Sequence, residues 1–89
     1  MITIKKFSRP GCRPCTALAN YLGDIDLFVA GVTLENVDIT EHPEVIDKYN
    51  LNSVPVLAFF RNGVEVGRLV GLVGTEEILD AIEHAKVVR

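Results

Sequence analysis

The chain has 89 residues, of which 48% are hydrophobic and 24% charged, with twelve acids and nine bases. This length suits one domain, and we expect residues 1–89 to form a single domain. The composition is that of an ordinary globular protein and excludes a disordered or fibrous chain. The net charge of −3 gives no general attraction to nucleic acid or to anionic membranes, so neither is an expected partner.

Two cysteines are too few for the multi-disulfide framework of small secreted domains. The first seven residues alternate like a strand and lack the apolar run of a signal peptide. No window holds the ~18 apolar residues of a membrane span. We therefore expect a cytoplasmic protein in a reducing compartment.

The first half of the chain predicts a strand–helix–strand unit. Residues 2–7 alternate as a strand that places Ile2, Ile4 and Lys6 on one face. A helix is predicted from Cys15 to about Ala30, because apolar residues recur at steps of three and four. The apolar residues of this stripe are Leu18, Tyr21, Leu22, Ile25, Phe28 and Val29. Gly31 ends the helix, and the β-branched segment 32–39 predicts a second strand parallel to the first.

The second half predicts two further strands and two further helices. Pro43 fits the first turn of a short helix at 44–49, and the apolar run 56–60 is typical of a central strand covered on both faces. An Asn62–Gly63 turn then leads into an antiparallel strand at about 64–73. A last helix is predicted to start at Gly74 and to bury Ile78, Leu79, Ile82 and Ala85. The result is an α/β fold of order β-α-β-α-β-β-α, with a four-stranded mixed sheet flanked by three helices.

The sequence Cys12-Arg13-Pro14-Cys15 lies where the first strand meets the first helix. Backbone N–H groups at a helix start have no partners in the helix, so they stabilise a thiolate on Cys12, and Arg13 adds positive charge. Pro14 suits an early helical position and holds both sulfurs on one turn. We predict a redox-active pair in which Cys12 is the nucleophile and Cys15 the resolving thiol, with no other bound cofactor.

Three other interpretations of the two cysteines are weaker. A purely structural disulfide between residues three apart closes too short a loop to stabilise the fold much. A zinc site would have to use His42 and His84, which lack finger-type spacing, so no metal site is expected. Inert buried thiols fit poorly with the charged neighbour Arg13. A dithiol metal-binding module without turnover remains a lesser alternative.

The segment from Tyr49 to Val56, followed by Phe59-Phe60-Arg61-Asn62-Gly63, resembles the part of thioredoxins that contains their cis-proline and hairpin. Pro55 lies 43 residues after Cys12, close to the family spacing, and the spacing from Gly71 to Ile78 also matches. Almost the whole chain therefore resembles a small member of the thioredoxin family. The resemblance implies the thioredoxin fold and a thiol–disulfide oxidoreductase that reduces protein disulfides.

The resemblance also implies roles for residues distant from the cysteines. The Val54–Pro55 bond would be cis and lie opposite Cys12, with the Val54 backbone pairing to an extended client segment and Gly71 keeping the adjacent surface open. From the residues alone, a trans Pro55 that opens a strand and a simple strand bend at Gly71 remain alternatives.

The same resemblance implies partners. The expected electron donor is an NADPH-dependent flavoprotein, thioredoxin reductase. The expected acceptors are disulfide-containing client proteins, with ribonucleotide reductase as one candidate, and the chain is expected to act as a monomer.

The chain departs from the thioredoxin pattern at two places beside the cysteines. Gly11 stands where the family has an aromatic residue. Lys6 stands where the family has a buried acid, and Leu34 at about the place of the lysine that pairs with it. The acid of the usual proton route to Cys15 is therefore missing. Lys6 either favours a thiolate electrostatically or extends from the strand end to solvent.

Arg9 suggests glutaredoxin instead, because a basic residue three positions before the cysteine meets a glutathione carboxylate in that family. An ordinary solvated loop cation is the alternative, and we favour it. The tail 71–77 lacks the Gly-Gly and Asp-Asp pattern that binds the tripeptide in glutaredoxins, and Arg13-Pro14 replaces their usual Pro-Tyr. A glutathione-dependent enzyme thus remains the alternative to thioredoxin-like electron transfer.

Overall fold

The computed structural model describes residues 1–88 and has a four-stranded sheet of strand order β2-β1-β3-β4. The strands are β1 (Ile2–Ser8), β2 (Val32–Asp38), β3 (Val56–Arg61) and β4 (Val64–Val70). β1 is parallel to β2 and antiparallel to β3, which is in turn antiparallel to β4. The predicted mixed sheet and its β-α-β start are therefore confirmed.

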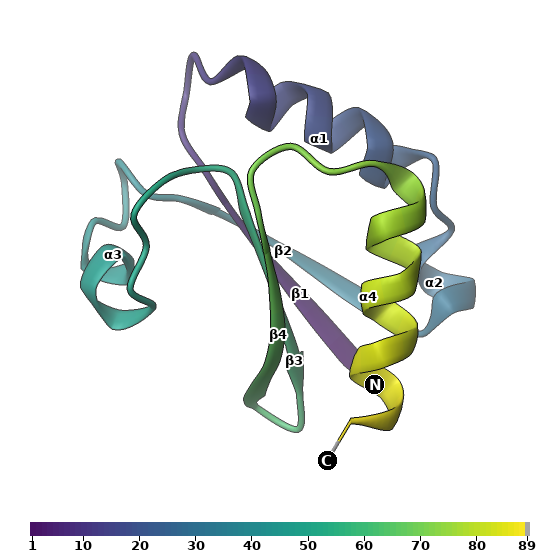
Figure 1. The fold of residues 1–89 in the computed structure, drawn as a ribbon. Helices are drawn as coiled ribbons and strands as arrows, with labels where there is room; N and C mark the ends of the chain where they lie inside the picture. The colour runs from purple at the N-terminus through teal and green to yellow at the C-terminus, as the bar shows by residue number, and fades with distance from the viewer. Residues whose placement is uncertain (89) are drawn as a thin grey trace.

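Four helices cover the sheet, one more than predicted. They are α1 (Arg13–Gly23), α2 (Leu27–Ala30), α3 (Glu44–Lys48) and α4 (Thr75–Val87). Figure 1 shows α1, α2 and α4 on one side of the sheet and α3 on the other. Within residues 1–88, no helix is both long and apolar enough to cross a bilayer.

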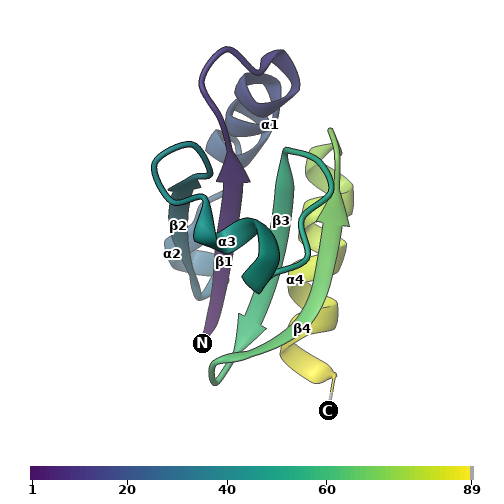
Figure 2. The same ribbon diagram turned by 90° about the vertical axis from the view of Figure 1, so that its left-hand side faces the viewer.

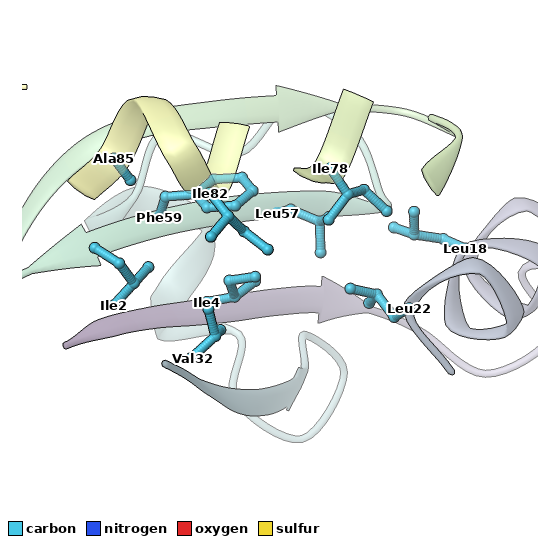
Figure 3. Close-up of a cluster of buried hydrophobic side chains, with 10 residues drawn as sticks. All are labelled: Ile2, Ile4, Leu18, Leu22, Val32, Leu57, Phe59, Ile78, Ile82 and Ala85. Carbon is cyan, nitrogen blue, oxygen red and sulfur yellow. The ribbon is translucent and has the colours of Figure 1, made fainter. Parts of the chain in front are cut away.

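The larger core cluster fills the space between the sheet and the helices α1 and α4 (Figure 3). Its members from the sheet include Ile4, Leu57 and Phe59, each 0% exposed, and α4 contributes Ile78 and Ile82. Alternation along β3 directs Phe60 to the opposite face, where it joins a smaller cluster beside α3. The prediction that Phe59 and Phe60 pack on opposite faces is therefore confirmed.

The first predicted helix is wrong beyond Gly23, because the chain turns there and starts the separate helix α2. Gly23 disfavours helix, and the carboxylate of Asp26 accepts a hydrogen bond of 3.1 Å from the Val29 N–H, which begins a new helix. Two residues assigned to the buried stripe are in fact exposed, Phe28 at 91% and Val29 at 79%. Tyr21, another stripe residue, is 40% exposed.

Two further predictions need correction in the last third of the chain. β4 ends at Val70 rather than near 73, because Gly71 takes a left-handed backbone with φ of +86°. In α4 the buried residues are Ile78, Ile82 and Ala85, whereas Leu79 is 42% exposed. A helix face that packs on a sheet is narrower than the apolar pattern of this segment.

The sheet register brings three segments that are distant in sequence to the same end of the sheet. Phe7 of β1 pairs with Val56 of β3, which pairs with Val70 of β4. Ser8 and Gly71 follow these residues, and Pro55 precedes Val56. The C-terminal end of β1, the start of β3 and the end of β4 therefore meet next to the start of α1 (Figure 2).

Candidate functional site

Cys12 and Cys15 form a disulfide, with their Cα atoms 5.2 Å apart. Cys12 is the N-cap of α1, and its Sγ accepts a hydrogen bond of 3.2 Å from the Cys15 backbone N–H. Both cysteines are buried, with 5% and 4% exposure, so exposure does not distinguish them. The N-cap hydrogen bond distinguishes the two cysteines, because a backbone N–H that has no partner within the helix is directed at Cys12 and not at Cys15.

The residues around the disulfide explain why α1 starts where it does. Gly11 has a φ of +74°, a left-handed conformation in which a side chain is strained, and this turn directs the chain from β1 into the helix. Arg13 and Pro14 are the first two residues of α1 and are exposed. Because Pro14 has no N–H, the Cys15 amide is the donor that reaches the Cys12 sulfur.

Val54, Pro55 and Gly71 lie together at the end of the sheet where β1 and β4 end and β3 begins. The Val54–Pro55 peptide bond is cis, Pro55 is buried and Val54 is half-buried. The Gly71 N–H donates a hydrogen bond of 2.8 Å to the Pro55 carbonyl. A Cβ on Gly71 would meet no atom within 4 Å, so the glycine leaves open space beside Pro55. The structure thus brings these three residues together.

Arg9 and Val54 both line a hollow of about 410 Å³ that is formed by the segments after β1, β2 and α3 and by α3 itself. The apolar part of its lining, here called its floor, consists of Ile39, Ile46 and Leu51, and residues 52–54 also line it. Sequence reasoning missed these three apolar residues as part of a site. Ile39 follows β2, Ile46 lies in α3 and Leu51 follows α3, so only the three-dimensional fold brings them to Arg9.

Lys6 is the one charged residue that is buried in the part of the chain that the structure describes, with 9% exposure. It lines a cavity bounded by β1, β2, α1 and α2, together with Ala19 and Leu22 of α1, which share a helix face with Cys15. No hydrogen bond or ion pair of the described residues involves its ammonium, and no side-chain nitrogen there is both fully buried and unpaired. The side chain therefore extends through the cavity toward solvent.

Burial lowers the pKa of Lys6 from its ordinary value of 10.5, because desolvation penalises the ammonium. This loss of folding stability is fully present below the pKa of Lys6 in the folded protein and disappears as the pH rises to its pKa in the unfolded chain. Lys6→Met should therefore raise the free energy of unfolding at pH 7 by about 1 kcal/mol, and the gain should shrink toward pH 10.5. Urea unfolding across this pH range measures both effects.

Lys48→Met is the matched control for this substitution, because Lys48 is exposed on α3. Its effect should stay within about 0.5 kcal/mol at every pH. A gain from Lys6→Met that does not change with pH would show that desolvation of the ammonium is not the cause.

Among residues 1–88, no three side chains of His, Cys, Asp or Glu are close enough together to hold a metal ion. His42 lies within 3.4 Å of Glu44 on the surface, and both side chains are largely exposed.

Comparison with known proteins gives one family. The sequence matches the family model described as Thioredoxin over residues 2–84. It is 34% identical to a thioredoxin of Chlamydia caviae over 73 residues, which are 82% of this chain and 72% of the relative. It is 36% identical to the SPbeta prophage-derived thioredoxin-like protein YosR of Bacillus subtilis over 67 residues, 74% of this chain and 78% of the relative.

Solved structures show the same fold. The thioredoxin-2 structure from a malaria parasite superposes with a TM-score of 0.85 at 17% identity, over 93% of this chain and 82% of that one. The oxidised thioredoxin of Plasmodium falciparum gives 0.79 at 27% identity, over 92% and 78%. The predicted fold class is therefore confirmed.

Family match, fold and paired cysteines agree with one another. The matched region includes the disulfide at the start of α1, and the relatives named above are thioredoxins or thioredoxin-like proteins rather than glutaredoxins. The redox-active disulfide Cys12–Cys15 is thus the reactive group. The chain belongs to the thioredoxin family and is a thiol–disulfide oxidoreductase that reduces protein disulfides.

Proposed function

We propose that Cys12 is the attacking thiol and Cys15 the resolving thiol. The observation that supports this order is the hydrogen bond of 3.2 Å from the Cys15 N–H to the Cys12 Sγ. In the reduced protein the same donor, at the positive end of α1, would stabilise a Cys12 thiolate. Cys15 follows one turn later, with no comparable backbone donor directed at its sulfur.

The exchange needs no other group. The Cys12 thiolate attacks one sulfur of a client disulfide, and the other client sulfur leaves as a thiolate that takes up a proton. The Cys15 thiol then loses its proton and attacks Cys12 Sγ, the second client sulfur leaves as a thiolate that takes up a proton, and the Cys12–Cys15 disulfide remains. Two electrons pass to the client, and a donor must return two electrons to this disulfide.

Arg13, Pro14, Val54, Pro55 and Gly71 are proposed to support the reaction. Arg13 adds positive charge beside Cys12, and Pro14 leaves the Cys15 amide as the capping donor. The Val54 backbone would pair with an extended client segment, and this pairing would bring the client disulfide to Cys12. The open space beside Gly71 would admit that segment.

The partners and setting proposed here are those of a cytoplasmic thioredoxin. Residues 1–89 would act as a single domain and as a monomer. The donor would be an NADPH-dependent flavoprotein thioredoxin reductase, and ribonucleotide reductase is a candidate among the client proteins. Arg9 as a glutathione-carboxylate residue is disfavoured, because the family match is to thioredoxin.

The donor is tested by reducing insulin with this protein under two electron supplies. We expect turnover with NADPH plus thioredoxin reductase at a rate at least about tenfold above that with glutathione alone, because the chain lacks the residues that hold the tripeptide in glutaredoxins. Following NADPH oxidation and insulin precipitation measures both rates. Rapid turnover with glutathione alone would reverse the proposed donor, and no turnover with either would contradict the proposed reductase activity.

A further inference from the structure

The hollow beside Val54 combines one cationic side chain with apolar ones, and pairing of a client with the Val54 backbone uses neither. It adjoins the residue proposed to bind the client backbone, and its one charged lining residue, Arg9, stands three positions before Cys12. Side chains of an extended client alternate across its backbone. Because Val54 itself lines the hollow, a client segment that pairs with the Val54 backbone can place one of its side chains over it.

Among residues 1–88, which the structure describes, Arg9 forms no ion pair with an acidic side chain. The described ion pairs of lysine and arginine join Lys5 to Glu35, Arg68 to Glu65 and Lys86 to Glu83, and none involves Arg9. The other residues that line the hollow are apolar or neutral. The guanidinium is thus available to a carboxylate that comes from outside the chain.

The charge distribution along the sequence favours the same kind of ligand. Residues 1–23, which include both cysteines, contain four bases and no acid, for a net charge of +4. Residues 24–89 contain five bases and twelve acids, for a net charge of −7, which together with +4 gives the −3 of the whole chain. Because Lys5 pairs with Glu35 and Lys6 is buried, the exposed positive charge near the cysteines in sequence comes from Arg9 and Arg13, and it attracts an acidic client although the protein as a whole is acidic.

The shape and floor of the hollow suit a short side chain with a carboxylate at its end. Leu51 is 7% exposed and Ile46 is 37% exposed, so the floor combines a buried apolar side chain with one that a ligand can reach. The methylene groups of a glutamate can cover this floor while its two oxygens accept hydrogen bonds from the fork of the guanidinium. The apolar floor also excludes water from one side of the pair, which strengthens the attraction.

We propose that this hollow is a specificity subsite in which Arg9 selects client disulfides with an acidic residue next to the attacked cysteine. The proposal rests on the proposed function and names the class of client that the enzyme prefers. It assigns Arg9 to recognition of a protein side chain, and Ile39, Ile46 and Leu51 to the apolar part of the same contact.

The test uses three cyclic peptides, each closed by one disulfide and identical except for Glu, Gln or Lys beside both cysteines. The reduced protein should react with the Glu peptide about fivefold faster than with the Gln peptide, and slowest with the Lys peptide. Stopped-flow measurement of the second-order rate constant gives the preference. Raising the ionic strength to about 1 M should reduce the preference for the Glu peptide, because the Debye length falls to about 3 Å.

Two variants of the exposed Arg9 separate recognition from reactivity. Arg9→Gln should remove the preference and leave the rate with the Gln peptide unchanged, whereas Arg9→Glu should reverse the preference toward the Lys peptide. Lys48→Gln, with the same change in net charge but outside the hollow, should retain the preference. Titrating the Cys12 thiolate by its ultraviolet absorbance should show no difference between Arg9→Gln and the unmodified protein.

Equal rates with all three peptides would overturn the proposal. So would an Arg9→Gln variant that slows all three peptides by the same factor, because Arg9 would then act on the reaction and not on the client. A protein that reduces none of the peptides would instead contradict the proposed reductase activity, so the two failures are distinguishable.

Discussion

Replacing Cys12 by serine should lower the rate of insulin reduction by about a thousandfold or more, to the uncatalysed background, because a serine hydroxyl is not ionised at neutral pH and cannot attack a disulfide. The fold should survive, since a disulfide between residues three apart closes a short loop. Circular dichroism checks that it does. An unchanged reduction rate in Cys12→Ser would contradict the assignment of the nucleophile.

Cys15→Ser is the matched variant, because it removes the other sulfur of the same disulfide. Its turnover should fall equally, but its Cys12 can still attack, so mixed disulfides with clients should accumulate and appear as higher-mass bands on non-reducing gels. Cys12→Ser should give none. Adducts in Cys12→Ser and none in Cys15→Ser would reverse the proposed order of attack.

Phe59→Ala should lower the free energy of unfolding by about 3–5 kcal/mol, because the ring is 0% exposed at the centre of the core under α4. Small domains have only about 5–15 kcal/mol in total, so this change removes a large part of the stability. The melting temperature should fall by roughly 12 °C or more. Thermal and urea unfolding followed by circular dichroism measure the loss.

Phe28→Ala provides the control for Phe59→Ala, because it deletes the same side chain where 91% of it is exposed. Its effect should stay within about 0.5 kcal/mol. Similar losses from the two substitutions would show that the cluster shared by Phe59 and α4 does not dominate the stability of the fold.

Local signals in the sequence were sufficient for the sheet and for the reactive pair. The strand at β3 follows from five successive apolar residues, and the hairpin from Asn62 and Gly63, which both adopt positive φ in the structure. The cysteines follow from a motif placed at a strand–helix junction. Each of these features depends on residues that are neighbours in the chain.

The predictions that are wrong concern residues whose burial depends on what packs against them. Phe28 and Leu79 continue apolar patterns but are 91% and 42% exposed, and an apolar residue on an exposed helix face costs little stability. The depth of Lys6 was unpredictable for the same reason, because the alternation of β1 gives only the face and α1 decides how much of the side chain is covered. The Arg9 hollow needs three loops at once, and no sequence pattern encodes their meeting.

The connection of Pro55 to β3 has a consequence for the entropy of client capture. β3 has a hydrogen-bonded neighbour on both sides and provides Leu57 and Phe59 to the core, so Pro55 is attached directly to a central part of the fold. A binding segment fixed in this way has little disorder to lose when a client binds. The cost of ordering then falls mainly on the client, and disulfides in flexible, locally unfolded segments should be captured more slowly than those already held in an extended form.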